Sequence, residues 1–262
     1  MNYKRILAIG DIHGEFDKFM SMYKKVKATD EDLIIYLGDY IDRGKDNIKA
    51  LKWIINESKK DNVIALRGNH EQMMLDFFDN DDYNWLCNGG DVTIKELKQW
   101  IAVEKNALTT VFELLDGLKY YHKMEINGEE YIFCHAGIRP TVQFDKQLIR
   151  DLLWIREEFF VLYDEPTKIV AGHTPVMYLK TDEEIEQYRK TIENSLSDYK
   201  SGKLKLAKEK VLRTYSELVK VRNPKPEWRR DNKILMMDTG SYLPNGRVSC
   251  VDILTGEIWQ ND

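Results

Sequence analysis

Short apolar runs alternate along the chain with longer stretches in which apolar residues recur every three or four positions. The runs are four to six residues long, which is the usual length of a buried β-strand. We predict strands at Arg5–Gly10, Asp32–Leu37, Asn62–Leu66, Glu130–Cys134, Lys168–Ala171 and Lys233–Met237.

The stretches between several of these runs carry the spacing of amphipathic helices. Apolar residues recur at positions i, i+3, i+4 and i+7 between Phe16 and Val26, and a similar stripe runs from Ile48 to Ile55. Such a stripe is typical of a helix that buries one face. Residues 92–118 indicate one or two further helices. Strands that alternate with helices predict an α/β fold.

A short polar signature follows each predicted strand. These signatures are GDIHG from Gly10, GDYIDRG from Gly38, RGNHE from Arg67, HAG from His135, GHT from Gly172 and DTG from Asp238. Any one of them could be an ordinary turn, because Gly, Asp and Asn are common turn residues. However, four of the five histidines fall inside the signatures. Since the carboxyl ends of strands in an open α/β sheet share one edge, we expect the signatures to converge on one site.

The side chains in these signatures resemble a metal-ligand set. Asp11 and His13 are two residues apart, so an extended backbone would point both to the same side. The later strand ends add Asp39, Asn69, His135 and His173. Mixed oxygen and nitrogen donors suit manganese, iron or zinc rather than calcium.

Six ligands are too many for a tetrahedral zinc site with an open position, but they fit two ions that share a carboxylate. Two ions about 3.5–4 Å apart can hold a hydroxide and clamp a phosphoryl group for in-line attack. The residues therefore predict metal-assisted phosphoester hydrolysis.

The remaining polar residues of the signatures then acquire roles. His70 follows the predicted ligand Asn69 and could protonate the leaving oxygen, with Asp42 as its orienting partner. Arg43 and Arg67 carry planar guanidinium groups that suit phosphate oxygens. The alternative for both arginines is a surface salt bridge.

Taken in order, these motifs resemble the calcineurin-like metallophosphoesterase superfamily. Within it, they are similar to the Ser/Thr phosphoprotein phosphatase family, and RGNHEQMM and WLCNGG look like its bacterial and phage lambda-type members. The resemblance implies a four-layer α/β/β/α architecture, in which a β-sandwich of two sheets is flanked by helices. This architecture replaces the simpler open parallel sheet that the alternation of elements suggests.

The resemblance also implies a role for each matching residue. Asp11, His13 and Asp39 would bind one divalent ion, and Asp39, Asn69, His135 and His173 would bind the second. The ions would be manganese, with iron or zinc as alternatives. His70 would be the catalytic acid paired with Asp42, and Arg43 and Arg67 would contact phosphate. Phage-type members carry a further phosphate-binding arginine after a tryptophan, and LLWIREEF offers Arg156.

For the substrate, the resemblance leaves two alternatives open. DYIDRG and GNHE look like a Ser/Thr protein phosphatase, which acts on phosphomonoesters in proteins. HAGI, from His135 to Ile138, matches the symmetrical diadenosine tetraphosphatases, which are nucleotide hydrolases, at least as well. The expected partner is thus a phosphoprotein or a phosphorylated small molecule or nucleotide. A catalytically silent scaffold is disfavoured because every presumed ligand is present.

Composition restricts the class of protein further. The chain has 262 residues, of which 43% are hydrophobic and 32% charged, with a net charge of −5. We expect a single domain over residues 1–262. No apolar stretch approaches the ~20 residues of a membrane span. The three scattered cysteines fit reduced thiols, so we expect a soluble, cytoplasmic protein.

Residues 181–232 form a stretch that the compact family core does not need. Ile185, Tyr188 and Ile192 keep helical spacing, and Ser201–Gly202 suggests the turn of a helical hairpin, followed by the loop VRNPKPEWRRDNK. Residues 200–233 contain twelve Lys and Arg against four Asp and Glu. The insertion could be a solvated helical surface or a basic lid that attracts anionic substrates. Nucleic-acid binding is disfavoured, because Trp228 is the only aromatic residue in the closing loop.

Overall fold

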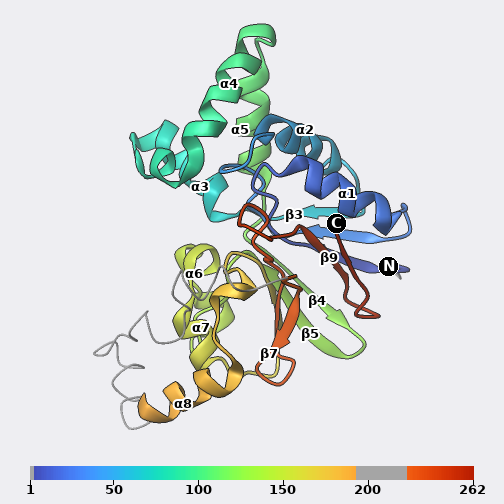
Figure 1. Cartoon of the computed structure of the whole chain (residues 1–262), viewed down its shortest axis with the longest axis vertical. Coiled ribbons are helices and arrows are strands. Elements are labelled where there is room, and N and C mark those ends of the chain that lie inside the picture. The colour runs from blue at the N-terminus through green and yellow to red at the C-terminus, as the bar shows by residue number, and fades with distance from the viewer. Residues whose placement is uncertain (1–2, 193–222) are drawn as a thin grey trace.

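The computed structural model describes residues 3–192 and 223–262, and it places two five-stranded sheets face to face between two layers of helices (Figure 1). The first sheet has the order β10-β9-β1-β2-β3, and the second has the order β4-β5-β6-β8-β7. This is the four-layer α/β/β/α arrangement that the resemblance implied.

Each sheet combines three neighbouring parallel strands with two strands that are joined by antiparallel pairing. In the first sheet, β1 (Ile6–Ile9), β2 (Leu33–Tyr36) and β3 (Val63–Ala65) are parallel, and β9 (Ser249–Asp252) and β10 (Ile258–Gln260) are antiparallel additions. In the second, β5 (Glu129–Cys134), β6 (Lys168–Ala171) and β8 (Ile234–Met236) are parallel, with β4 (Tyr121–Ile126) and β7 (Glu227–Arg229) antiparallel at the edges.

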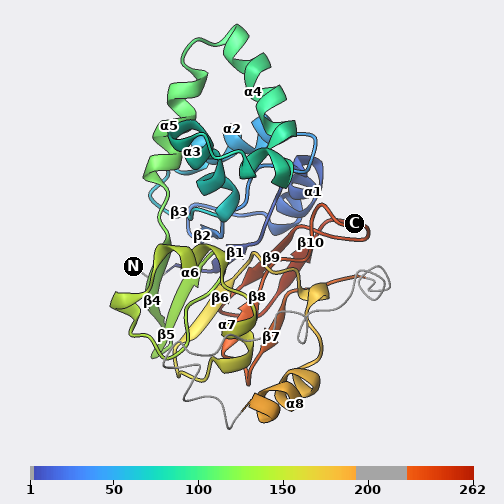
Figure 2. The same ribbon diagram turned by 90° about the vertical axis from the view of Figure 1, so that its left-hand side faces the viewer.

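The helices divide between the two outer faces (Figure 2). The layer on the first sheet contains α1 (Phe16–Val26), α2 (Asn47–Glu57), α3 (Asn69–Asn80), α4 (Asp91–Val103) and α5 (Ala107–Gly117). The layer on the second sheet contains α6 (Ile149–Trp154) and α7 (Glu157–Leu162), with α8 (Asp182–Ile192) beside α7. Shorter turns occur at Leu86–Gly90, Phe144–Lys146 and Val176–Tyr178.

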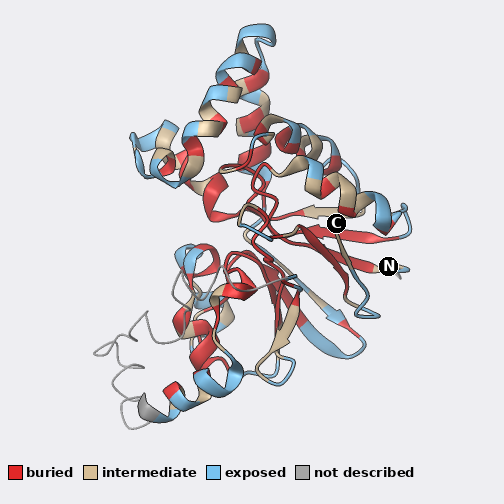
Figure 3. Ribbon diagram, viewed as in Figure 1, coloured by how far each residue is buried: buried red, intermediate tan, exposed pale blue. Residues whose placement is uncertain are grey.

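Alternation along the strands explains why the layers stack in this way. In β1, Ile6 and Ala8 pack between the two sheets, whereas Leu7 and Ile9 pack against the helices of the first layer. The same division holds in β6, where Val170 faces the other sheet and its neighbours face α6 and α7. Both faces of these strands are therefore buried (Figure 3). This is why they read in the sequence as continuous apolar runs.

All six predicted strands are present, and no strand end differs from its predicted position by more than one residue. The predicted helices are also present, and residues 92–118 form two helices, α4 and α5. One prediction is wrong: part of the segment VRNPKPEWRRDNK is not a loop. Residues 227–229 form β7, and Trp228 packs against the core between the sheets.

Part of the predicted insertion lies outside the described residues, including the hairpin expected around Ser201–Gly202. In the described part, α8 confirms the first helical stretch, and its Ile185 and Tyr188 are buried. At the other end of the insertion, Arg229 and Arg230 pair with acidic residues of α8.

Within the described ranges, none of the helices combines the length and the apolar character that a membrane-spanning segment requires.

Candidate metal centre and active site

The six predicted ligands come from five different strand ends and meet at one edge of the sandwich. Asp11 and His13 follow β1, Asp39 follows β2, and Asn69 begins α3 after β3, each within four residues of the strand. His135 directly follows β5 of the second sheet, and His173 lies two residues after β6. All six side chains are buried. The convergence predicted from the strand-end signatures is thus present in the fold.

One group of potential ligand atoms forms around His13. Nε2 of His13 lies 3.5 Å from Oδ2 of Asp39 and 3.9 Å from Oδ2 of Asp11. The Nδ1–H of His13 donates to the carbonyl of Ile41 at 3.0 Å, so Nε2 carries the free lone pair. His70 also belongs to this group, because its Nε2 lies 3.9 Å from the same Asp39 oxygen.

A second group forms on the other side of Asp39. Nε2 of His135 lies 3.3 Å from Oδ2 of Asp39 and 2.9 Å from Oδ1 of Asn69. Nδ1 of His173 lies 2.8 Å from the same Asn69 oxygen. Oδ2 of Asp39 therefore faces both groups, because it lies close to Nε2 of His13 and to Nε2 of His135.

The backbone at these residues is strained in a way that aims the side chains inward. His13, Asp39 and His173 have φ values of 49°, 54° and 63°, and Asp42 and Arg43 have 76° and 71°. Residues other than glycine rarely occupy this left-handed region, and such outliers concentrate at functional sites. Five of the residues singled out from the sequence share this feature, although other residues of the described chain, such as Lys27 and Asn127, also have positive φ values.

The electrostatics of the site favour the presence of cations. Burial raises the pKa of Asp11, and the neighbouring Asp238 adds to this shift. Burial also opposes ionisation of Asp39, but the nearby His135 and His70 bring the pKa of its carboxyl well below the usual range. Burial would lower the pKa of His135, whereas Asp39 and Asp11 raise it to about 9. The buried carboxylates thus stabilise positive charge in their midst.

The donor atoms fit divalent ions. The Nδ1–H of His135 donates to the carbonyl of Leu37 at 2.9 Å. When the ring is neutral, Nε2 of His135 therefore carries a lone pair. This nitrogen and the side-chain oxygen Oδ1 of Asn69 then face each other with no hydrogen between them. Nε2 of His173 is buried and has no hydrogen-bond partner among the described atoms. Burial lowers the pKa of His13 and of His173, which keeps both rings in the neutral form that binds metals.

His70 and Asp42 form the pair that the sequence predicts. Nδ1 of His70 lies 2.6 Å from Oδ2 of Asp42, and both side chains are buried. Trp85 donates its indole N–H to the same oxygen at 2.9 Å, and the hydroxyl of Thr93 donates to Oδ1 at 2.5 Å. With its carboxylate held from three sides, Asp42 fixes the ring of His70 so that Nε2 points toward Asp39.

Glu71 and Gly68 hold the two neighbouring loops together. The Glu71 carboxylate accepts hydrogen bonds from the backbone N–H groups of Asp39 and Tyr40, each at 2.8 Å, and from that of Gly68 at 3.0 Å. Burial and the nearby Asp39 raise the pKa of Glu71 to about 7. In turn, Oδ1 of Asp39 accepts the N–H of His70 at 3.0 Å, at the N-terminus of α3. These contacts fix the position of Asp39 relative to Asn69 and His70.

Two of the three predicted phosphate-binding arginines lie at the site. Nη1 of Arg43 is 3.0 Å from Nε2 of His13, and its guanidinium lies 4.1 Å from the ring centroid of Tyr242. Nη1 of Arg156 donates to the hydroxyl of Thr174, next to His173, at 2.8 Å. Burial lowers the pKa of Arg156, and the charge of nearby Asp238 opposes that change. Positive charge therefore borders both groups of potential ligands.

The structure gives Arg67 a different set of contacts from the phosphate contact that the sequence predicts. Its Nη1 donates to Oε1 of Gln72 and to the hydroxyl of Tyr120, each at 2.9 Å, and its Nη2 donates to the carbonyl of Leu115 in α5. The residue is buried, and Nε has no hydrogen-bond partner. The guanidinium is thus turned toward α5 and is already occupied by protein acceptors.

Several residues that contribute to the site were missed from the sequence. Trp85 lies in the WLCNGG stretch that carried part of the family resemblance, but nothing in its spacing connects it to Asp42. Thr93 carries no motif at all. Asp238 was recognised only as part of DTG, and it is a buried carboxyl whose pKa burial raises to about 6. The GHT motif pointed to Thr174, although only as a neighbour of His173.

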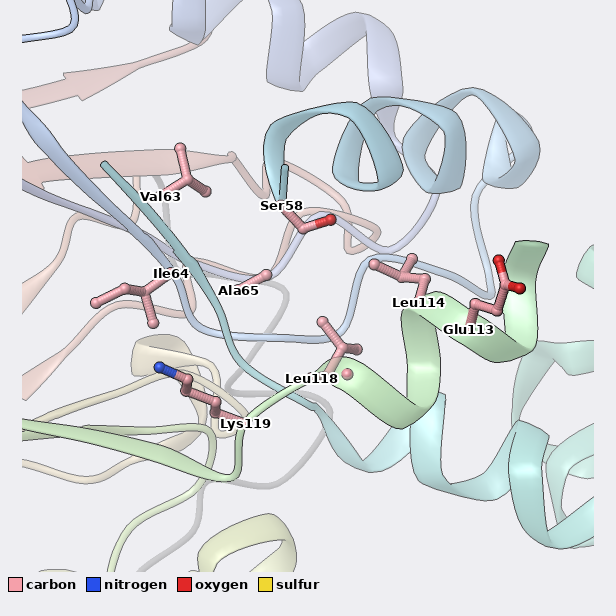
Figure 4. A pocket seen from close by; sticks show the side chains of 9 residues that line it. Ser58, Val63, Ile64, Ala65, Glu113, Leu114, Leu118 and Lys119 are labelled. Carbon is pink, nitrogen blue, oxygen red and sulfur yellow. The ribbon is translucent and has the colours of Figure 1, made fainter. Parts of the chain in front are cut away.

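A separate cavity of about 280 Å³ lies at the outer edge of β3, where α2 and α5 end (Figure 4). Its wall consists of Ser58, Val63, Ile64, Ala65, Glu113, Leu114, Gly117, Leu118 and Lys119. None of these is a predicted ligand or catalytic residue. The cavity is therefore distinct from the metal centre, although Lys119 contacts the backbone of Arg67.

Comparison with known proteins gives the same picture. Residues 4–206 match the family of calcineurin-like phosphoesterases. Serine/threonine-protein phosphatase 1 of Salmonella typhimurium strain LT2 is 32% identical over 160 residues, which cover 60% of this chain and 70% of that protein. The asymmetrical bis(5'-nucleosyl)-tetraphosphatase PrpE of Bacillus cereus strain Q1 is 27% identical over 195 residues, covering 64% of this chain and 78% of that protein.

A solved structure extends the similarity to the whole fold. A crystal structure provisionally named a diadenosine tetraphosphatase superimposes with a TM-score of 0.57 at 16% identity, covering 98% of this chain and 92% of that chain. At this level of identity the match shows that the fold is shared.

Proposed function

The chain belongs to the calcineurin-like phosphoesterase family, and on that premise we propose that it removes phosphate from phosphoserine and phosphothreonine in proteins. The family makes it a metal-dependent phosphoester hydrolase. Support for a protein substrate comes from the relatives of Salmonella typhimurium that are named serine/threonine-protein phosphatases, which are 32% and 33% identical to this chain.

We propose that the two groups of side chains hold two divalent ions. Asp11, His13 and Asp39 would hold one ion, while Asn69, His135 and His173, together with Asp39, would hold the other. Manganese suits this mixture of oxygen and nitrogen donors, as do iron and zinc. Two bound ions would polarise the phosphoryl oxygens and lower the pKa of a water molecule for attack on phosphorus.

The chain's own residues would supply binding and proton transfer. Arg43 and Arg156, on opposite sides of the ligand groups, would orient the phosphoryl oxygens. His70 would donate the proton on Nε2 to the departing oxygen of the serine or threonine. Asp42 holds Nδ1 of His70 at 2.6 Å and would stabilise the protonated ring before transfer. Asp42 and Arg43, which are consecutive in the sequence, both have left-handed backbone conformations.

The position of Asp39 between the two histidine groups is the observation that carries this proposal. A carboxylate oxygen 3.5 Å from His13 and 3.3 Å from His135 suits a bridge between two ions. His70 also points its Nε2 at this oxygen from 3.9 Å. An acid beside a two-ion centre suits phosphomonoester hydrolysis, because the ions would activate the water and the acid would protonate the departing oxygen.

Hydrolysis of dinucleoside tetraphosphates is the second candidate function. It is favoured by the relative from Bacillus cereus, whose name states that activity, and by the HAGI sequence at His135. That relative is named as asymmetrical, whereas HAGI resembles the symmetrical enzymes. Both activities would use the same ligands and differ in what surrounds the phosphate.

A substrate panel tests the proposal. With saturating Mn²⁺, kcat/KM is compared for an aryl phosphate, a phosphoserine peptide, a phosphothreonine peptide and diadenosine tetraphosphate, with Asp39→Asn as the inactive control. We expect kcat/KM to be highest for the phosphopeptides. A higher value for diadenosine tetraphosphate would replace the proposal with the second candidate. No hydrolysis of any substrate by a metal-loaded chain would contradict both.

A further inference from the structure

We propose that Arg67 is a positioning residue, which fixes the catalytic start of α3 against the end of α5. It would act through Asn69 and His70, not through contact with the substrate. The inference rests on the proposed function only for the roles of Asn69 and His70.

The backbone of Arg67 joins two segments that are far apart in the sequence. Its N–H donates to the carbonyl of Lys119 at 2.7 Å, and Leu66 pairs with Lys119 as an isolated parallel bridge. Lys119 follows α5 and leads into β4, so this bridge lies where the chain passes from the helical layer to the second sheet. Two residues further along from Arg67, α3 begins with Asn69.

The side chain of Arg67 makes the same connection more extensively. Its guanidinium donates to the carbonyl of Leu115 in the last turn of α5 and to the hydroxyl of Tyr120 beyond it. It also donates to Gln72 in the first turn of α3. The group lies 4.9 Å from the ring centroid of Tyr120, in a cation–π contact. Arg67 thus connects the start of α3 with the end of α5 through hydrogen bonds from one rigid group.

The charge of Arg67 suits this position. Carbonyl groups in the last turn of a helix lack intrahelical partners, and a cation there is stabilised by the helix dipole. No salt bridge within residues 3–192 and 223–262 includes Arg67. A buried guanidinium is costly unless its donors are satisfied, and here three protein acceptors take three of the four N–H groups on the two terminal nitrogens. These contacts hold both terminal nitrogens against Gln72, Tyr120 and the carbonyl of Leu115.

The cavity beside β3 makes the connection important. Val63, Ile64 and Ala65 line one side of it, and Leu114 and Leu118 line the other (Figure 4). Side chains of β3 and α5 therefore do not fill the space between these elements. Where apolar packing is incomplete, a hydrogen-bonded bridge contributes more to holding the two elements in register. Arg67 provides that bridge next to the residues that carry the chemistry.

The test compares Arg67→Gln with Arg43→Gln, which removes an arginine from the site itself. Mn²⁺ affinity is measured by calorimetry, and kcat, KM and the inhibition constant of inorganic phosphate are measured with an aryl phosphate. For Arg67→Gln we expect a fall of roughly 10- to 100-fold in Mn²⁺ affinity, in kcat or in both, as for other residues that orient metal ligands. KM and the phosphate inhibition constant should stay within about twofold, because no phosphate contact is lost. Arg43→Gln should raise both constants.

Two milder variants keep the test decisive if Arg67→Gln does not fold. Arg67→Lys retains the charge but loses the planar guanidinium group, and Tyr120→Phe removes one hydrogen-bond acceptor. Both variants should change Mn²⁺ affinity and kcat in the same direction as Arg67→Gln, but by a smaller factor. A rise in the phosphate inhibition constant equal to that of Arg43→Gln would overturn the proposal. A lower melting temperature with unchanged Mn²⁺ affinity and kcat would also overturn it. Mn²⁺ affinity is measured without substrate, so this arm stands even if every substrate in the panel fails.

Discussion

Nη1 of Arg43 lies 3.0 Å from Nε2 of His13, the nitrogen that carries the lone pair of the imidazole. This lone pair is the one that an ion in the first proposed site would use. An arginine N–H and a metal ion cannot bind it together. In the same conformation, the guanidinium carbon of Arg43 lies 4.1 Å from the centroid of the Tyr242 ring. Arg43 and the first ion therefore compete for one atom.

Arg43→Met should strengthen the binding of the first Mn²⁺ ion. The variant removes both the competing donor and a positive charge, and we expect a gain of about tenfold in affinity, which corresponds to about 1.4 kcal/mol. Calorimetric titration of the metal-free chain measures it. Lys45→Met is the matched control, because Lys45 carries the same charge two residues away on an exposed side chain. Unchanged or weaker Mn²⁺ binding in Arg43→Met would contradict the competition.

His70→Asn should lower kcat by about 10²- to 10⁴-fold, the usual contribution of a general acid. KM should change little, because His70 acts on the departing oxygen. The bound Mn²⁺, counted by elemental analysis, should stay the same as in the unmodified chain. This measurement is needed because His70 lies close enough to His13 and Asp39 to serve as a ligand. Loss of an ion in His70→Asn would assign it to the metal centre instead.

The central strands could be predicted because both of their faces are buried. Runs such as residues 6–9 and 168–171 are apolar at every or nearly every position, and the structure places them between two packed layers. By contrast, β10 and β7 are three-residue edge strands with partly exposed side chains. β9 contains buried Ser249 and Asp252, so it lacks an apolar pattern. Its place is set by pairing with β1, which is distant in the sequence.

The metal centre was predictable for a different reason, and only in part. Its proposed ligands lie within four residues of strand ends, and the carboxyl ends of strands share one edge of the sheet, so the fold brings these residues together. Trp85 and Thr93 reach Asp42 from 43 and 51 residues away, and no spacing rule connects them. Arg67 was assigned to phosphate binding because it is close to Asn69 in the sequence. Its long side chain instead donates to the carbonyl of Leu115, and the position of that carbonyl depends on how α5 packs.

Asp32→Asn should destabilise the protein at neutral pH and much less in acid. Arg5 donates to both oxygens of Asp32, at 2.9 and 2.6 Å, and holds the pKa of that carboxyl below its usual range. Because the pKa of Asp32 is lower in the folded state than in the unfolded state, its charge stabilises the fold at pH values above the unfolded-state pKa of 3.8. This stabilisation is lost as the pH falls through the folded-state pKa. We expect the substitution to reduce the free energy of unfolding by about 1.5–3 kcal/mol at pH 7.

Urea unfolding at pH 7 and near pH 3, in the presence of a chelator, measures this difference. Asp30→Asn, at an exposed position nearby, is the control and should have little effect at either pH. An equal loss of stability for Asp32→Asn at both pH values would show that the carboxylate charge is not responsible.

Gly68→Ala should disrupt the metal centre without altering any proposed ligand. A Cβ on Gly68 would lie 2.1 Å from Oδ1 of Asp39 and 2.7 Å from Oε2 of Glu71, closer than side-chain contacts allow. The φ of Gly68 is −92°, which suits any residue, so the effect should come from displacement of Asp39 and not from backbone strain. Because Asp39 faces both groups of ligands, we expect calorimetry to show a loss of roughly tenfold or more in Mn²⁺ affinity at both sites.

Gly117→Ala is the control, since a Cβ there would meet nothing within 4 Å, and its Mn²⁺ affinity should be unchanged. Normal binding at both sites in Gly68→Ala would show that Asp39 can move without loss of the ions, which is incompatible with its proposed role as the shared ligand.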